Sequence, residues 1–383
     1  NNGISFGDEE NKLGIHSSST RQVFFNETKV PVDHMLSERE NGFKIAMNAL
    51  NVGRIKLGVA CLDAQRRVIN NSVKYANDRV QFNKPISEFG AIKEKIARMA
   101  TSCYVGESAN YRAAHDIELK INSLRQNGLK NDKAELKGVE EFAIECSIIK
   151  VATSEDIQNC ADDGIQIFGG MGFSADTPME SAWRDARIGR IYEGTNEINR
   201  MLLVGMLFKK SLKGELDLMS AVMKVTSEIS EGAFEEKVEI DQILFIEKQK
   251  IKNLKKIFLM IAGHAFQKYG QDLDKNQQIL IGLSNIMIEI YFSESAILRT
   301  IKNNKSGKNV ENQIDMTRLY VFEAVEIALK SSKEITANIV KESEQINLMK
   351  SIDRLCKYEE IPNIIDLKKR VANKVIAENS YCF

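Results

Sequence analysis

Apolar residues recur at steps of three and four over most of the chain, which is the spacing of amphipathic helices. The clearest stripe follows Pro85 and contains five apolar residues three or four positions apart: Phe89, Ile92, Ile96, Met99 and Cys103. The same periodicity predicts a helix from Ser37 to about Tyr75 and another from roughly Glu135 to Asp163. Long helices with few breaks predict an antiparallel helical bundle.

Two later helices are predicted from their start signals. The segment 177–180, Thr-Pro-Met-Glu, has the sequence of a capping box with proline at the first helical position, and predicts a helix to about Gly189. Thr195 or Asn196 is expected to cap the next helix. A glycine-dense bend is predicted over residues 166–173, ahead of both helices.

The first thirty residues have a different pattern. Two short β-prone runs, 22–25 and 29–32, flank the polar segment 26–28 and predict a hairpin over residues 20–32. A lone hairpin is only marginally stable in water, so this one is expected to belong to a larger sheet. No other convincing strand is expected in the chain, and we therefore expect the remainder of a β domain to be missing from it.

Composition and charge exclude several classes of protein. Lysine plus arginine and aspartate plus glutamate both total 53, whereas nucleic-acid-binding proteins normally carry a basic excess. The six cysteines form no CxxC pair and the four histidines are scattered, which predicts reduced thiols and no metal site. No window approaches the roughly 20 apolar residues that span a bilayer, so an integral membrane protein is not expected.

Residues 214–383 are rich in Lys, Glu, Ile, Asn and Ser, and are expected to form a second helical unit. Five lysines in this unit alternate with apolar residues: Lys248, Lys250, Lys252, Lys255 and Lys256. A basic amphipathic helix could contact membrane headgroups or an acidic partner. The simpler interpretation is a bundle helix with a solvated lysine face, because the unit must bury its apolar faces somewhere.

Three features could carry chemistry. Glu193 lies in a short bend beside Gly194, where an apolar wall could raise its pKa and make it a general base. The glycines after Gln166 would let a flat or phosphorylated ligand approach the main chain. Arg54 and Arg79 offer guanidinium groups suited to phosphate. The ordinary alternatives are an exposed loop glutamate, a helix C-cap with its turn, and solvated or ion-paired arginines.

Five short motifs occur in a characteristic order: NVGR at 51–54, NDRVQFNKPI at 77–86, QIFGGMGF at 166–173, WRD at 183–185 and RIYEGTNEI at 190–198. Over residues 12–212 their order and spacing resemble the acyl-CoA dehydrogenase family. The chain looks most similar to the very-long-chain branch, whose members carry an added C-terminal helical domain. The resemblance implies a mainly α fold with a catalytic antiparallel helical bundle at 37–213. The end of a middle β domain would precede the bundle at 1–36, and an additional helical domain would follow at 214–383.

The resemblance implies that Glu193 is the catalytic base in FAD-dependent α,β-dehydrogenation of a long-chain fatty acyl-CoA to a trans-2-enoyl-CoA, in fatty acid β-oxidation. The implied substrate-binding residues are Asn51, Arg54, Tyr192 and Gly194. The implied FAD-binding residues form three groups along the chain: Arg79, Gln81 and Phe82; Gln166, Ile167, Phe168, Gly169 and Gly170; Thr195, Asn196 and Glu197. The first two groups match positions at the flavin of the neighbouring subunit, so a homodimer is the expected minimum functional unit.

The same resemblance implies an electron-transferring flavoprotein as the electron acceptor. An acyl-CoA oxidase and a non-enzymatic helical scaffold of the same fold are the alternatives. We expect a bacterial, cytoplasmic protein, with peripheral contact to the inner membrane face as an open option. The resembled family also has an N-terminal helical domain and a complete β domain. The chain as printed is therefore expected neither to hold FAD tightly nor to turn over substrate by itself.

Overall fold

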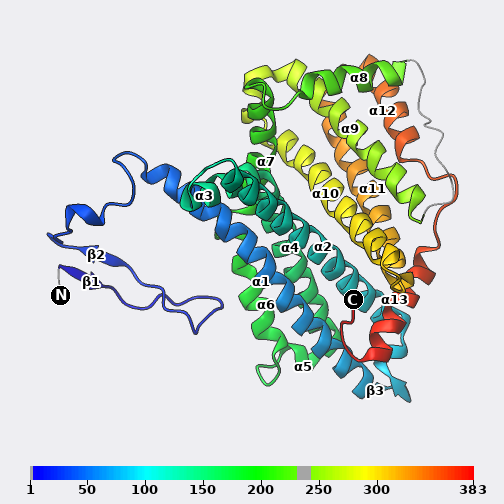
Figure 1. Ribbon diagram of the computed structural model, residues 1–383. Coiled ribbons are helices and arrows are strands. Elements are labelled where there is room, and N and C mark those ends of the chain that lie inside the picture. Colours follow the sequence, from blue (N-terminus) through cyan, green and yellow to red (C-terminus); the bar gives the residue numbers. More distant parts are fainter. Residues whose placement is uncertain (1–2, 231–242) are drawn as a thin grey trace.

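A computed structural model describes residues 3–230 and 243–383 of the protein. Helices account for most of these residues, which confirms the mainly helical fold class (Figure 1). The long helices are α1 (Gly42–Asp78), α2 (Gly90–Gln126), α4 (Ala143–Phe168), α9 (Phe245–Tyr269), α10 (Gln277–Lys305) and α11 (Glu311–Ile339). The shorter helices are α3 (Asn131–Glu141), α5 (Gly170–Phe173), α6 (Met179–Arg187), α7 (Asn196–Leu212), α8 (Leu218–Ser230), α12 (Glu342–Cys356) and α13 (Ile364–Glu378).

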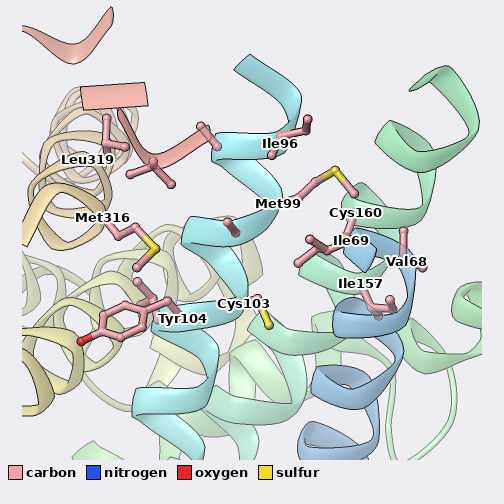
Figure 2. Packing of buried hydrophobic residues seen from close by; sticks show 14 of the residues in the cluster. Val68, Ile69, Ile96, Met99, Cys103, Tyr104, Ile157, Cys160, Met316 and Leu319 are labelled. Atoms are coloured by element: carbon pink, nitrogen blue, oxygen red, sulfur yellow. The ribbon is translucent and has the colours of Figure 1, made fainter. Parts of the chain in front are cut away.

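The first bundle is built around α1, α2 and α4, which pack against one another along their lengths. Figure 2 shows how their apolar stripes meet: Ile69 of α1, Met99 and Cys103 of α2, and Cys160 of α4 lie in one cluster of buried side chains. The stripe predicted after Pro85 is therefore the buried face of α2 from its second turn onward. Burying a large apolar side chain stabilises the fold by about 1.5–3 kcal/mol, so this cluster holds the three helices in fixed positions.

Two predicted helix boundaries were wrong. The helix expected over 135–163 is divided into α3 and α4, with the break at Phe142, whose φ of −100° and ψ of 26° lie outside the helical range. The first helix begins at Gly42 and not at Ser37, because Ser37 and Glu40 have φ angles of 66° and 71°. An L-residue with positive φ cannot continue a right-handed helix.

The predicted capping box at the start of α6 was also wrong. The Thr177 hydroxyl donates a hydrogen bond to the carbonyl of Met171 at 2.7 Å, and caps no amide of α6. The Glu180 carboxylate instead accepts from Arg184 one turn later, at 2.7 Å. The proline at the start of the helix was placed correctly within one residue, since Pro178 immediately precedes Met179.

The N-terminal hairpin has a different strand partner from the one predicted. Strand β2 (Val23–Phe25) pairs antiparallel with β1 (Ile4–Phe6), and the run 29–32 forms no strand. Pro31 explains this difference, because a proline has no N–H to donate to a ladder and its φ is fixed. The two strands stand away from the helices (Figure 1). The segment that joins them contacts α6, where Asp185 accepts a hydrogen bond from the amide of Ile15 at 2.6 Å.

Helices from the second half of the chain complete the core of the first bundle. Phe292 of α10, Met316 of α11 and Val371 of α13 are buried in the same cluster as Ile96 and Tyr104 of α2. A second buried cluster lies mainly among α9, α10, α11 and α12. The predicted domain boundary at residues 213/214 stays a prediction.

The segment after α12 returns to the first helix of the bundle. The amide side chain of Asn77, near the end of α1, donates to the carbonyl of Ile376 at 3.1 Å and to the Asn379 side chain at 2.9 Å. The backbone N–H of Tyr381 donates to the side chain of Asn70 at 2.7 Å. These hydrogen bonds fix α13 and the residues after it beside α1.

The lysine-rich segment is part of α9, and three of its lysines have partners within the fold. Lys250 is buried, and its ammonium group donates to the carbonyls of Cys356 and Lys357. Lys255 pairs with Glu294, and Lys256 pairs with Glu228 at 2.8 Å. These contacts favour a bundle helix over a free basic face.

The expectation that no segment is long and apolar enough to cross a membrane was wrong by length and composition. Within residues 3–230 and 243–383, two helices meet those criteria, α1 and α10, each with a window of mean hydropathy 1.2. Core helices of a folded bundle meet the same criteria, and 61% of the α10 window is buried inside the structure. Packing against neighbouring helices accounts for the apolar character of that window.

Candidate active site

The bend that holds Glu193 has an unusual backbone. Glu193 and Gly194 have φ angles of 59° and 81°, between the 3₁₀ turn Ile188–Arg190 and α7. A glycine adopts positive φ at little cost, but a glutamate does so only when its surroundings hold it there, at a cost of about 1–3 kcal/mol. Contacts from other elements must therefore stabilise this bend.

Asn199, one turn into α7, contacts the bend most extensively. Its side-chain nitrogen lies 3.3 Å, 2.8 Å and 3.1 Å from the carbonyl oxygens of Glu193, Gly194 and Thr195, and donates to them. Thr195 caps α7 as predicted, because its hydroxyl accepts from the amide of Ile198 at 3.3 Å. Three successive carbonyls of the bend are thereby turned toward the protein.

Arg54 of α1 contacts the same bend. Its side chain is only 2% exposed, and its Nε donates to the carbonyl of Glu193 at 3.2 Å. Its Nη1 donates to Asn51 at 3.1 Å and to Ser147 of α4 at 3.3 Å. Burial lowers the pKa of Arg54, although the guanidinium group remains charged at any ordinary pH. A buried, charged donor thus fixes the carbonyl of Glu193.

The Glu193 carboxylate lies directly over the backbone of α1 at Gly53. A Cβ atom on Gly53 would lie 2.5 Å from Oε2 and 2.7 Å from Oε1 of Glu193. A side chain at position 53 would therefore displace the carboxylate, so glycine at this position makes room for it. The carboxylate is half-buried and stays accessible to a ligand.

Two pockets lie on either side of this carboxylate along α1. The basic pocket, about 570 Å³, is lined by Arg54, Asn51 and six lysines: Lys44, Lys120, Lys137, Lys209, Lys210 and Lys213. Only three acidic residues share its lining. The apolar pocket, about 450 Å³, is lined by α1, α6 and Tyr192, with Leu57, Cys61, Val68, Met179 and Ala182 among its residues. Arg54 and Leu57 are one turn apart on α1, so Glu193 over Gly53 lies where the two pockets approach each other.

A buried lysine that the sequence analysis missed also contacts the bend. Lys150 of α4 is fully buried, and its ammonium group donates to the carbonyl of Gly194 and to the Asn196 side chain, each at 2.7 Å. Burial, together with the charge of Arg54, lowers the pKa of Lys150 to about 8. The signal in the sequence was a single lysine inside the apolar run 148–152. An ammonium group at a buried helix position requires partners, but the run alone does not identify them.

The structure brings together eight of the predicted site residues, but their side chains are not equally accessible. The eight are Asn51, Arg54, Tyr192, Glu193, Gly194, Thr195, Asn196 and Glu197. Asn196 is 1% exposed, and its side chain contacts Lys150, Ser154 and Glu155. Any contact that Asn196 makes with a flavin would therefore come from its main chain.

The remaining predicted residues lie near the opposite end of α1. Arg79, Gln81 and Phe82 belong to a hairpin of β3 (Val80–Gln81) and β4 (Lys84–Pro85). Figure 1 places β3 and α5 at one end of the bundle. Phe168 stacks on Tyr75 near the end of α1, with ring centroids 4.1 Å apart. Arg54 and Arg79 are 25 positions apart, about 37 Å along a helix axis, so the predicted flavin-binding residues form two separate groups.

This second group has features that fit a flat, anionic ligand. Phe82 is 87% exposed at the tip of the hairpin, and the described residues provide no hydrogen-bond partner for the Arg79 guanidinium. Gly169 and Gly170 face open space, where a Cβ would contact nothing within 4 Å. Ile167 and Phe168, in contrast, are core residues of α4. Gln166 is exposed on α4. Gln166, the glycines and the hairpin are therefore the parts of this group that a flavin could contact.

The helical bundle holds one carboxylate between a basic and an apolar pocket. This arrangement is typical of a protein that binds an elongated ligand with an anionic end and an apolar end. The family model described as "Acyl-CoA dehydrogenase, C-terminal domain" matches residues 40–207, and a second model of the same description matches residues 253–354. The chain belongs to the acyl-CoA dehydrogenase family.

Individual relatives support this assignment. A probable acyl-CoA dehydrogenase of Bacillus subtilis is 38% identical over 382 residues, 99% of this chain and 64% of the relative. The human mitochondrial very long-chain specific acyl-CoA dehydrogenase is 38% identical over 201 residues, 52% of this chain and 28% of that protein. A crystal structure of an acyl-CoA dehydrogenase complexed with FAD from Bacillus anthracis superposes with a TM-score of 0.95 at 37% identity, covering 100% of this chain and 64% of that one. The chain thus spans less than two thirds of these relatives.

Proposed function

We propose that this chain is the catalytic part of an enzyme for FAD-dependent α,β-dehydrogenation of long-chain fatty acyl-CoA to trans-2-enoyl-CoA in fatty acid β-oxidation, with Glu193 as the general base. The observation that carries the proposal is the position of the Glu193 carboxylate over Gly53, between the basic and the apolar pocket. A fatty acyl-CoA has a polyanionic nucleotide, a thioester and an apolar chain in that order. Along α1, the basic pocket, the Glu193 carboxylate and the apolar pocket follow one another in the matching order.

The residues of the bend have complementary roles in this proposal. Arg54 and Asn199 bind the carbonyl of Glu193 and fix the peptide unit that follows this residue. The N–H of Glu193 lies in the peptide unit before it, and the described residues provide no acceptor for that N–H. That N–H would donate to the thioester carbonyl and stabilise the negative charge that develops on the oxygen. The α-proton becomes more acidic, and the Glu193 carboxylate removes it. Bound FAD would supply the acceptor for the hydride that leaves the β-carbon as the double bond forms.

A homodimer would bring the two separated groups of flavin-binding residues together. The bend contributes Thr195 and Glu197 near one flavin, whereas the β3–β4 hairpin and Gly169–Gly170 would contact the flavin of the second copy. The exposure of Phe82 and the distance along α1 support this arrangement. We propose a bacterial, cytoplasmic enzyme. Weak binding of FAD by the printed residues alone stays a prediction.

The proposal is tested by Glu193→Gln, which keeps the size of the side chain but removes the base. With saturating FAD and palmitoyl-CoA under anaerobic conditions, the rate of flavin reduction should fall about 10⁴-fold or more while acyl-CoA still binds. The matched control is Glu118→Gln on the exposed face of α2, which should leave the rate unchanged. Flavin reduction at the parent rate by the Glu193 variant would exclude this function.

The proposed electron acceptor is an electron-transferring flavoprotein. An acyl-CoA oxidase would instead pass electrons to oxygen, and the same preparation distinguishes the two. Turnover that produces stoichiometric hydrogen peroxide, and that a dye acceptor does not accelerate, would favour the oxidase. Rapid dye reduction with little peroxide would favour the dehydrogenase.

A further inference from the structure

A continuous line of hydrogen bonds joins the Glu193 bend to α10 in the second half of the chain. Lys150 donates to Gly194 and to Asn196, and Asn196 donates to Glu155 at 2.9 Å. Glu155 accepts two hydrogen bonds from Arg200 of α7, at 2.7 Å and 2.8 Å. Arg200 in turn donates to the side chain of Asn285 in α10 at 2.9 Å. We call Lys150, Asn196, Glu155, Arg200 and Asn285 the relay residues.

Burial restricts the partners to which the polar groups of Lys150 and Asn196 can bond. Lys150 and Asn196 are almost completely buried, so neither can exchange its partners for water. A buried polar group that loses its partner costs about 1–3 kcal/mol, and more if it is charged. The relay therefore has one favourable arrangement, in which the carbonyl of Gly194 points at Lys150.

We propose that the relay residues position the catalytic bend, so that Asn285 of α10 helps to hold Glu193 in its left-handed conformation. The inference rests on the function proposed above for Glu193. It assigns the second helical unit a role in catalysis, through a positioning contact and not through substrate. Lys150 and Asn285 are positioning residues, because they contact the bend or its supports and not the carboxylate itself.

The backbone conformation explains why the bend needs this support. Glu193 and Gly194 both have positive φ, and the left-handed conformation of Glu193 is not its preferred state. Arg54 and Asn199 bind the carbonyl of Glu193, but Asn199 must distribute one amide group over three carbonyls. Lys150 supplies the bend with a second charged donor. Without it, the peptide unit after Gly194 loses its charged donor and can rotate, and the adjoining Glu193 is then free to leave its left-handed conformation.

The charges around Lys150 support the same conclusion. Burial and the charge of Arg54 disfavour the ammonium form, whereas the carboxylates of Glu155 and Glu197 favour it, and the resulting pKa is about 8. Lys150 is therefore protonated below that pH, and its charge is matched by the carboxylate of Glu155 through Asn196.

The first test is Lys150→Met, read by hydrogen exchange and by kinetics. The amides of Tyr192 and Ile198 are hydrogen bonded on either side of the bend and should lose about tenfold or more of their protection. The amide of Ile86 in the β3–β4 hairpin is the internal reference and should be unchanged. With saturating FAD, kcat should fall about 10- to 100-fold with a smaller change in KM, because the loss is in orientation and not in binding.

The second test uses Asn285, which is remote from the bend. Asn285→Leu removes the acceptor for Arg200 at similar volume and should lower kcat roughly threefold, with a matching loss of amide protection at the bend. Asn285→Asp restores an acceptor and should recover most of both. The matched control is Asn159→Leu, an exposed asparagine of α4 that lines the same cavity as Asn285, which should change neither quantity.

The outcomes separate this inference from the proposed function. Parent-like exchange at the bend in Lys150→Met, or equal effects of Asn285→Leu and Asn285→Asp, would overturn the relay. If Glu193→Gln still reduced flavin normally, the proposed function would fail while the exchange results remained informative about the bend. If Glu193→Gln abolished reduction but the relay variants did not alter kcat or exchange, only the relay would be wrong.

Discussion

Glu155 and Asp156 are adjacent carboxylates of α4, and their pKa values shift in opposite directions. Burial acts to raise the pKa of Glu155, but its hydrogen bonds with Arg200 outweigh burial, and the pKa is lowered. Asp156 has no cationic partner among the described residues, and burial together with Glu289 and Glu155 raises its pKa well above the ordinary value. In α4 the paired carboxylate fixes geometry, whereas burial favours the protonated form of the unpaired one.

The two residues differ in their partners and not in the cavity that they line. Both face a cavity of about 400 Å³ between the first bundle and α10 and α11, where Glu155 is paired with Arg200 in the relay that ends at the Glu193 bend. Asp156 shares this cavity with Glu289 and Glu323. We call these three residues the carboxylate cluster. The comparison predicts large effects on activity for changes near the bend, and effects on pH-dependent stability for changes in the cluster.

Among the residues that support the Glu193 bend, the largest effect is expected from Arg54→Met. The substitution removes the charged donor of the Glu193 carbonyl and leaves Asn51 and Ser147 without their partner. We expect kcat/KM to fall about 100-fold or more. The free energy of unfolding should fall by roughly 2–3 kcal/mol, because buried polar groups lose their hydrogen bonds. Stopped-flow flavin reduction and urea unfolding measure the two effects. A kcat/KM within a factor of three of the parent would mean that activity does not depend on the contact between Arg54 and the Glu193 bend.

The next effect is a gain in stability from Glu289→Gln at neutral pH. Burial, with the neighbouring Glu323 charge, raises the pKa of Glu289 from 4.5 to about 7. A raised carboxyl pKa means that stability is fully present below pH 4.5 and is lost as the pH rises through 7. The variant cannot ionise, so at pH 8 it should be more stable than the parent by up to about 3 kcal/mol, with the difference vanishing near pH 4.

Urea unfolding of parent and Glu289→Gln between pH 4 and pH 8 measures this difference. The matched control is Glu326→Gln on the exposed face of α11, which should show no such pH dependence. If the difference in the free energy of unfolding stayed constant across this pH range, Glu289 would not hold a proton in the folded state. The proposed contrast between the paired Glu155 and the carboxylate cluster would then be wrong.

The smallest effect is expected where charges are exposed. Lys137→Glu changes an exposed lysine of the basic pocket and should raise the KM for acyl-CoA about three- to tenfold, with little change in kcat. The effect should shrink as salt is added, because exposed charges are screened. The control is Lys133→Glu, one turn earlier on α3 and outside the pocket. Equal effects of the two variants would indicate a change in overall charge and not a binding pocket.

The sequence predicted the helical stripes and the position of the Glu193 bend, because both depend on local patterns. The α2 stripe, the Thr195 cap and the bend at Glu193 follow from the spacing of a few neighbouring residues. The resemblance of the motifs also predicted that Arg54 and Glu193 belong to one site, although 139 positions separate them along the chain.

Features that depend on three-dimensional contacts were not predictable in this way. The β1–β2 pairing joins residues about twenty positions apart through a segment with no strand signal. Lys150 looked like one polar residue in an apolar run, since its partners at Gly194 and Asn196 are more than forty positions away. The carboxylate cluster draws its members from α4, α10 and α11, and only their packing creates the cavity that shifts their pKa values.

The return of α13 to the first helix has a consequence for the order in which the protein matures during synthesis. Val371 and Val375 are completely buried in the core that α1 and α2 begin, and these helices start about 280 residues or more earlier in the chain. A ribosome therefore releases the bundle of the candidate active site with an open side, which closes only when α13 emerges. Contacts this distant in sequence form slowly, so nascent chains that stall before residue 364 should be the form of this protein most in need of a chaperone.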